Sequence, residues 1–174
     1  MPARLTPLTA ARLRDDPALA DALLALNNDH AMELSLLDET GLAALVEAAF
    51  LAAHVGIGDA LLIAMDQSSD YSSPNFLWFR DRFDRFVYVD RVVTAARARG
   101  QGLARLLYRS LFDQALAAGQ IRSVCEVNSD PPNPGSDAFH AALGFAQVGS
   151  ATLENGKTVR YLEKRLLPGT ITPR

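Results

Sequence analysis

The chain has 174 residues, of which 49% are hydrophobic and 21% charged, and its formal net charge is −3 at pH 7. This length suits one domain with a full core, so we expect residues 1–174 to form a single domain. The negative net charge argues against a nucleic-acid partner, because such a partner usually requires a basic surface.

The first part of the chain alternates helical and extended patterns. An Asp precedes Pro17 at the start of the first helix, and Asp38 is placed to cap the second. The run Gly56-Ile57-Gly58-Asp59 lies between two apolar runs, which is typical of a β-hairpin. The predicted elements are helices at residues 17–28 and 39–49 and strands at residues 50–55 and 60–65.

The second part begins with a polar loop at residues 66–75 and a short aromatic insert at residues 76–79. Gly119 ends a helical pattern, and Asn155-Gly156 is a strong hairpin signal between two later runs. The predicted elements are a central strand at residues 86–94, a helix at 101–118, a strand at 121–128, a short helix at 136–143, and strands at 145–153 and 157–166.

The most informative stretch joins the central strand to the helix that follows it. It reads Arg97-Ala98-Arg99-Gly100-Gln101-Gly102-Leu103-Ala104. The N–H groups of a first helical turn and the helix dipole attract an anion, and glycines let the backbone approach a phosphate closely. The dinucleotide fingerprint is not met because its third position is Arg105, and the Gly-Lys-Ser/Thr of a P-loop is absent. The stretch predicts a pyrophosphate site of another kind.

This stretch resembles the acetyl-CoA motif Gln/Arg-x-x-Gly-x-Gly/Ala of the GNAT acetyltransferase superfamily. Arg99-x-x-Gly102-x-Ala104 fits the motif, and so does Arg97-x-x-Gly100-x-Gly102. We prefer the first phasing, because Leu103-Ala104 then begins the helix as the apolar-small pair of the family does.

A second segment supports the resemblance. Cys125-Glu126-Val127-Asn128 is similar to the Leu-Glu-Val-Asn strand of the family, and Asn133, Ser136 and His140 follow at comparable spacing. The chain departs from the pattern by two additional residues after Val127, by Ser136 in place of Ala, and by His140 in place of Tyr. The two segments together cover about residues 86–148.

The resemblance implies an α/β fold with a mixed, mostly antiparallel central sheet covered by helices. It implies acetyl-CoA as the co-substrate, and the scattered histidines give no reason to expect a metal. Main-chain N–H groups near Val93 or Thr94 would hold the oxyanion, and Asn133 would contact the pantetheine arm. The residues expected at the cofactor are Val92, Val93, Thr94, Arg99, Gly100, Gln101, Gly102, Leu103, Ala104, Arg105, Asn133 and Ser136.

Acetyl transfer from a thioester to an amine needs a base. An aliphatic amine is mostly protonated near neutral pH, and its ammonium form has no lone pair for the attack. Asp90 on the central strand is one candidate, with an ion pair to Arg91, Arg82 or Arg85 as the alternative. Glu126 is the other candidate, and acidic residues are also common at this strand position of the family without a catalytic role.

The departing thiolate is a possible target for a general acid. His140 stands where many family members carry a Tyr facing the sulfur, and an imidazole suits reversible proton transfer. The alternative is a helix histidine packed in the interior and bonded to a carbonyl. Tyr161 and Tyr108 are further candidates for this acid.

The acceptor site is less well specified. His30 and Glu33 lie between the first two helices, where the superfamily often has acceptor loops. An aromatic residue near acidic groups can hold an organic amine, although such aromatics more often cover a sheet edge. The candidate acceptor residues are His30, Glu33, Tyr71, Asn75 and Trp78.

We therefore expect an enzyme that acetylates a primary amine, preferably of a small molecule, by direct attack in a ternary complex. The alternatives are a peptide N-terminal or lysine acetyltransferase and a non-catalytic CoA-binding regulatory module. Cys125 lies in an apolar strand, which favours a core role over an acyl-enzyme. A single cysteine excludes an intramolecular disulfide, and we therefore expect a cytoplasmic protein. We expect no membrane partner. A homodimer is one option for the assembly.

Overall fold

The computed structural model describes residues 3–168. Contacts within the chain divide it into two compact units. Unit 1 comprises Met1–Tyr71 and Val89–Leu111, and unit 2 comprises Ser72–Tyr88 and Phe112–Arg174. Strand β4 (Val87–Thr94) and helix α5 (Leu103–Ala117) each have residues in both units. The single domain expected from the sequence stays a prediction.

The helices of unit 1 begin at the caps that the sequence indicates. In α2 (Pro17–Asn28) the Asp16 carboxylate accepts from the Leu19 N–H at 3.1 Å, and in α3 (Glu39–Ala48) Asp38 accepts from Gly41 at 2.7 Å. Both predicted helices are confirmed, the second ending one residue early. Helix α1 (Ala10–Asp15), which Thr9 caps, was not predicted because six residues are too few to display a helical period.

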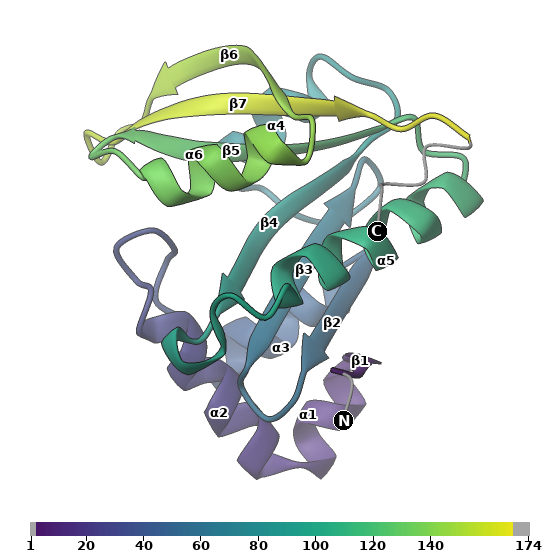
Figure 1. Ribbon diagram of the computed structural model, residues 1–174, viewed down its shortest axis with the longest axis vertical. Helices are drawn as coiled ribbons and strands as arrows, with labels where there is room; N and C mark the ends of the chain where they lie inside the picture. The colour runs from purple at the N-terminus through teal and green to yellow at the C-terminus, as the bar shows by residue number, and fades with distance from the viewer. Residues whose placement is uncertain (1–2, 169–174) are drawn as a thin grey trace. The chain divides into compact units, whose positions relative to one another are not determined.

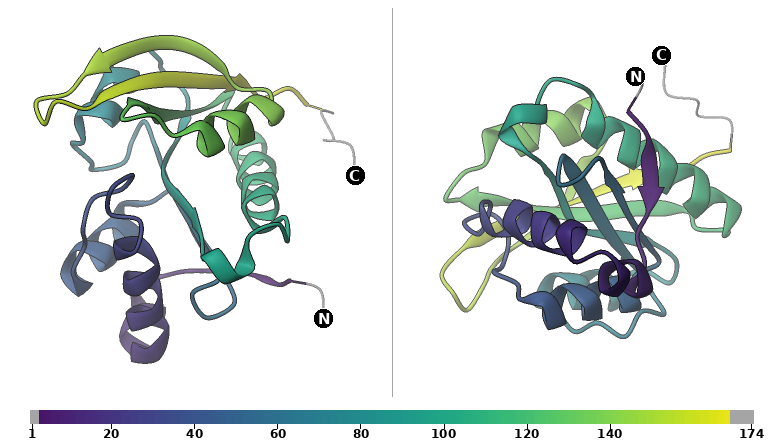
Figure 2. Two further views of the ribbon diagram at one scale, coloured as in Figure 1. Left: turned by 60° about the vertical axis from the view of Figure 1, so that its left-hand side comes forward. Right: turned by 90° about the horizontal axis from the view of Figure 1, so that it is seen from below.

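The strands of unit 1 are antiparallel. Strand β1 (Leu5–Pro7) pairs with β2 (Leu51–Val55), and β2 pairs with β3 (Ala60–Asp66), which confirms the hairpin. Strand β2 is buried throughout, as expected of strands covered on both faces. Helices α2 and α3 lie on one side of this sheet and the first part of α5 on the other (Figures 1 and 2).

Unit 2 contains the second half of the sheet. The start of β4 pairs in parallel with β5 (Arg122–Asp130), β5 pairs antiparallel with β7 (Thr158–Arg165), and β7 pairs antiparallel with β6 (Ala146–Thr152). The hairpin at Asn155-Gly156 is thus confirmed. The strand order is β1-β2-β3-β4-β5-β7-β6. Among the five strand pairs described above, β4–β5 is parallel and the others are antiparallel, which confirms the mixed, mostly antiparallel sheet.

Two helices cover opposite faces of the β5–β7–β6 sheet. Tyr161 and Arg160 are neighbours on β7, so their side chains point to opposite faces. Tyr161 stacks on Trp78 of α4 (Pro74–Arg80), whereas Arg160 pairs with Asp137 of α6 (Pro134–Ala142). Figure 1 shows the two helices flanking these strands. Residues 76–79, predicted as a short aromatic insert, lie instead in helix α4. This helix packs over Glu126 on β5 through Asn75.

None of the helices in the described part of the chain combines the length and the apolar character needed to cross a membrane.

Candidate active site

The glycine turn, residues 99–104, leads from the end of β4 into α5. A turn of 3-10 helix, η1 (Ala96–Ala98), follows the strand, and Gly100 and Gly102 then adopt φ values of +77° and +74°. These left-handed values favour glycine. A Cβ atom at either position would meet no atom within 4 Å, so packing against protein does not require these glycines. The two glycines allow the left-handed backbone conformation of the turn, and they leave the backbone uncovered by side chains at these positions.

The other residues predicted at the cofactor surround this turn in unit 1. Helix α5 begins at Leu103, so its first N–H groups lie beside the two glycines and have no partner within the helix. Such a helix start attracts a phosphate. Arg99 and Gln101 are exposed, Val93 and Leu103 are buried, and Val92, Thr94, Ala104 and Arg105 are half-buried.

Arg97, just before the turn, and Arg99, its first residue, have different environments. The guanidinium of Arg97 donates to the Asp59 carboxylate at 2.9 and 3.1 Å and to the carbonyls of Ile57 and Gly58 at 3.2 and 3.0 Å. The Ala95 N–H also donates to the Asp59 carbonyl at 2.8 Å. Arg97 therefore fastens the approach to the turn to the β2–β3 hairpin, while Arg99 extends into solvent. This difference favours the phasing that begins at Arg99.

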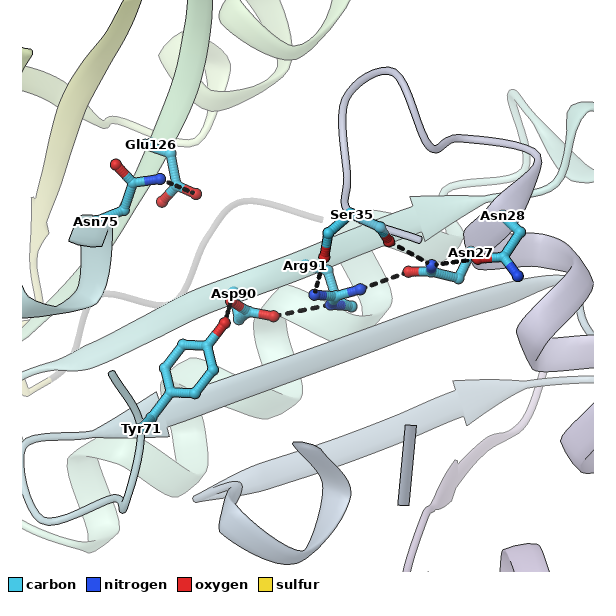
Figure 3. Close-up of polar contacts among 8 residues, drawn as sticks. All are labelled: Asn27, Asn28, Ser35, Tyr71, Asn75, Asp90, Arg91 and Glu126. Carbon is cyan, nitrogen blue, oxygen red and sulfur yellow. Dashed lines mark hydrogen bonds and ion pairs between the residues drawn. The ribbon is translucent and has the colours of Figure 1, made fainter. Parts of the chain in front are cut away.

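Asp90, one predicted base, belongs to a buried network of unit 1 (Figure 3). Its side chain is 5% exposed. One carboxylate oxygen accepts from the Tyr71 hydroxyl, and the other accepts from Nε of Arg91 at 2.8 Å. The structure thus joins the predicted residues Tyr71 and Asp90, and of the three arginines considered as partners it is Arg91 that forms the ion pair.

Glu126, the second predicted base, lies on β5 within unit 2 and is half-buried. The amide nitrogen of Asn75 on α4 donates to Oε1 of Glu126 at 3.1 Å (Figure 3), and the Tyr161 hydroxyl donates to the amide oxygen of Asn75 at 2.9 Å. Burial, followed by the negative charge of Glu126, raises the pKa of Tyr161. The phenol therefore keeps its proton near neutral pH and continues to orient Asn75.

Trp78 packs on the same face of the sheet. Its ring stacks on Tyr161 with centroids 4.2 Å apart, and the Arg82 guanidinium lies 4.1 Å from the ring centroid. Gly149 of β6 passes beneath the indole, where a Cβ atom would come within 2.5 Å of Trp78. These contacts favour the covering role for Trp78 over direct binding of an amine.

His140 is buried in α6 within unit 2, with 2% of its surface exposed. Its Nδ1 lies 2.8 Å from the Ser136 carbonyl, to which it donates, and 3.3 Å from the Ser136 hydroxyl. Burial lowers the pKa of His140, although the bond to Ser136 and the charge of Asp137 oppose this. A neutral ring with the proton on Nδ1 has no proton on Nε2, and this favours the packing alternative. The role in acid catalysis stays a prediction.

The two remaining predicted residues of unit 2 lie at the start of α6. Asn133 caps the helix, and its side-chain oxygen accepts from the Ser136 N–H at 3.2 Å. The sequence allowed Asn133 both this role and a contact with the pantetheine arm. Both residues are half-buried, and the contact with the arm stays a prediction.

His30 and Glu33 lie on the connection between α2 and α3 in unit 1. The half-buried His30 donates from Nδ1 to the Leu26 carbonyl at 2.9 Å, and Glu33 is exposed. The acceptor loop, as we call residues 29–38, also has Met32 and Leu36 each 71% exposed.

Sequence reasoning missed Asn27, which binds Arg91 from the end of α2. A signal was available, because Leu19, Leu23 and Asn27 follow one another at intervals of four residues on the buried face of the helix. A polar residue on an apolar face must find hydrogen-bond partners in the interior. Asp59 was also missed, since its partner Arg97 is 38 residues away.

Within residues 3–168, no group of three or more His, Cys, Asp or Glu side chains is placed to hold a metal ion.

Residues 75–145 match the model of the acetyltransferase (GNAT) family. This match includes Glu126, Asn133 and the whole glycine turn. No curated protein matches the sequence significantly. Residues 75–145 are thus similar to a GNAT acetyltransferase domain, and the class of enzyme that this domain defines is acyltransferase.

Solved structures share the fold over nearly the whole chain. The ribosomal-protein-S18-alanine N-acetyltransferase of Escherichia coli is 14% identical with a TM-score of 0.67, and the similarity covers 99% of each chain. The putative acetyltransferase YncA of Salmonella typhimurium, solved with its cofactor acetyl-CoA, is 18% identical with a TM-score of 0.65, covering 95% of this chain and 94% of that one. A spermidine N-acetyltransferase variant of Vibrio cholerae is 15% identical with a TM-score of 0.64 and the same coverage.

Proposed function

We propose that the protein transfers an acetyl group from acetyl-CoA to a primary amine, preferably of a small molecule, by direct attack in a ternary complex. The observation that carries this proposal is the glycine turn, which has two left-handed glycines and an open surface at the start of α5. The match of residues 75–145 to the GNAT family supports it, as does the acetyl-CoA bound in one structure of similar fold.

Acetyl-CoA would supply an activated acetyl group, and this chain would hold it by its backbone. The N–H groups at the start of α5 would bind the pyrophosphate, with Arg99 adding positive charge. Asn133 and Ser136 would contact the pantetheine arm, and the N–H of Val93 or Thr94 would stabilise charge on the carbonyl oxygen. The nitrogen–carbon bond would form first and give a tetrahedral intermediate. Its collapse would break the carbon–sulfur bond, so that CoA leaves with the electron pair as a thiolate.

We assign the role of base to Glu126. Its carboxylate would take the proton that the amine loses, directly or through a water molecule. The bond from Asn75, itself held by Tyr161, fixes one oxygen of this carboxylate in place. Asp90 suits the task less well, because the Tyr71 hydroxyl and Arg91 already engage its two oxygens.

The covering of Glu126 by α4 favours a small acceptor. Asn75 and Trp78 place this helix against the face of the sheet that holds Glu126 and Tyr161. An extended peptide needs a longer open groove than a small amine does. The structures of similar fold include enzymes named for spermidine and for a protein alanine, so fold alone does not choose between the acceptors.

An acceptor panel tests the proposal. Purified protein is incubated with acetyl-CoA and, separately, a polyamine, an amino-acid amide, a peptide with a free N-terminus and a lysine peptide blocked at its N-terminus. Thiol release and the acetylated product are both measured. We expect turnover with a small amine that exceeds turnover with the peptides. Acetyl-CoA binding without transfer to any amine would favour the non-catalytic module, and preference for a peptide would favour the protein-modifying alternative.

A further inference from the structure

The buried Arg91 connects the central strand to the acceptor loop. Its side chain is 5% exposed and lies entirely within unit 1. Nη1 donates to the Asn27 side-chain oxygen at 2.6 Å, and Nη2 donates to the Ser35 hydroxyl at 3.4 Å. A buried cation needs such partners, and the fork of a guanidinium reaches several at once. Two of these partners lie 56 and 64 residues away from Arg91 in the sequence.

The network continues from Asn27 to the far end of the loop. The Asn27 amide donates to the Ser35 carbonyl at 2.9 Å and to the Asn28 side-chain oxygen at 3.0 Å. Asn28 both accepts from the Leu37 N–H and donates to the Leu37 carbonyl, each at 3.0 Å. Residues at the two ends of the loop are thus tied together. Figure 3 shows that Arg91 binds Asn27 and Ser35, and that Asn27 in turn binds Asn28.

The part of the loop between these ties is exposed or half-buried. It carries His30 and Glu33, the residues expected to contact the acceptor, and the exposed side chain of Met32. A surface segment with polar and apolar groups, held at its base by buried hydrogen bonds, is suited to ligand binding because little order must be gained when a ligand binds.

We propose that Arg91 is a positioning residue that holds the acceptor loop in its amine-binding conformation, with Asp90 and Asn27 fixing the guanidinium from two sides. This inference rests on the proposed function, since it concerns the acceptor of that reaction. It assigns Asp90 an indirect role, because its carboxylate orients Arg91. It also separates acceptor binding from binding of acetyl-CoA, since no residue of the glycine turn belongs to this network.

Kinetic parameters distinguish this role from a general structural one. If the loop contributes binding that is equal in the ground state and the transition state, its loosening raises KM for the acceptor and leaves kcat unchanged. The variant Arg91→Lys keeps a positive charge for Asp90 but loses the fork that reaches Asn27 and Ser35. We expect about a tenfold rise in acceptor KM, a kcat within about twofold of wild type, and an unchanged Kd for acetyl-CoA.

Arg97→Lys is the matched control. Arg97 also bridges a carboxylate and distant carbonyls, but it fastens the glycine turn and not the acceptor loop. It should raise the Kd for acetyl-CoA and leave acceptor KM unchanged. Asn28→Ala provides a second test from the loop side if Arg91→Lys does not fold, because it removes both bonds to Leu37 and leaves the Arg91–Asp90 pair intact.

Hydrogen exchange of residues 29–38, measured without any acceptor, completes the experiment. We expect faster exchange there in Arg91→Lys and Asn28→Ala, with exchange in β2 and β3 unchanged. Faster loop exchange with an unaltered acceptor KM would overturn the inference while leaving acetyl transfer intact. A loss of kcat and of acetyl-CoA affinity together would equally overturn it. If wild-type protein acetylates no amine, the proposed function itself fails and this inference fails with it.

Discussion

The glycine turn and the acceptor loop are both connections in unit 1, yet their conformations are determined in different ways. The glycine turn depends on residues within a few positions of one another, since Gly100 and Gly102 supply the left-handed conformations and α5 begins at once. The acceptor loop depends on Arg91, more than fifty residues further along the chain. A site built from backbone groups is therefore evident in a short motif, whereas a site built from side chains emerges only from the fold.

The largest effect on activity should come from Glu126, the proposed base, which lies in neither the glycine turn nor the acceptor loop. Glu126→Gln keeps the shape of the side chain and a bond with Asn75 but cannot take a proton. We expect kcat to fall by about a hundredfold or more, with the Kd for acetyl-CoA unchanged. Initial rates and calorimetry on one preparation measure both. Asp90→Asn is the comparison, and a larger loss of kcat there than in Glu126→Gln would return the role of base to Asp90.

The next largest effect tests the local character of the glycine turn. Gly102→Val adds a branched side chain where the phosphate is expected and where φ is positive. We expect the Kd for acetyl-CoA to rise about tenfold or more, which corresponds to about 1.4 kcal/mol or more. Calorimetry with folded protein measures the change.

Gly156→Val is the control for Gly102→Val. Gly156 also has a positive φ, of +84°, and open space around it, but it lies in the β6–β7 hairpin. Both variants should lose some stability from backbone strain, and only Gly102→Val should lose affinity. An equal loss of affinity in the two variants would mean that the turn has no specific part in binding.

A smaller effect is expected from His140, whose environment is local to α6. His140→Ala removes a buried side chain together with its bond to the Ser136 carbonyl. We expect the free energy of unfolding to fall by about 1–3 kcal/mol, with kcat per folded molecule close to wild type. Thermal denaturation and rates at a temperature well below both transitions separate the two. A loss of about a hundredfold in kcat would instead support proton donation to the thiolate.

The smallest effect is the pH dependence that His140 contributes to stability. Burial lowers the pKa of the folded state below the ordinary value of 6.5. Below that value the unfolded chain binds a proton that the folded protein does not yet bind, so the contribution is complete above about pH 6.5 and is lost as pH falls through the pKa of the folded state. Denaturant unfolding from pH 7.5 downwards should show a smaller decline for His140→Phe than for wild type. Parallel declines would mean that this histidine does not titrate differently in the two states.

The elements that the sequence predicts correctly are those with local causes. Asp16 and Asp38 cap their helices, and Asn155-Gly156 turns the last hairpin, because each acts on backbone groups within a few residues. The helix α4 was missed because its first turn begins at Pro74 inside a serine-rich segment that is typical of a loop. Its stability comes from packing of Phe76 and Phe79 in the interior of unit 2.

The candidate site follows the same division. The residues around the glycine turn could be named from the sequence, but their hydrogen-bond partners could not. Nothing in the local sequence distinguishes Arg97, which binds Asp59, from Arg99. Asp90 and Glu126 are both acids on strands, and only their partners Arg91 and Asn75 separate a buried ion pair from an oriented carboxylate. Such pairings depend on tertiary structure, so a single sequence leaves both alternatives open.

Two-substrate kinetics test the central claim most directly. Initial rates are measured with acetyl-CoA and the best amine of the acceptor panel, each varied at several fixed concentrations of the other. Direct attack in a ternary complex predicts that double-reciprocal lines intersect, and that protein incubated with acetyl-CoA alone acquires no acetyl group. Parallel lines, with an acetyl group found on Cys125 by mass spectrometry, would contradict the account and establish an acyl-enzyme.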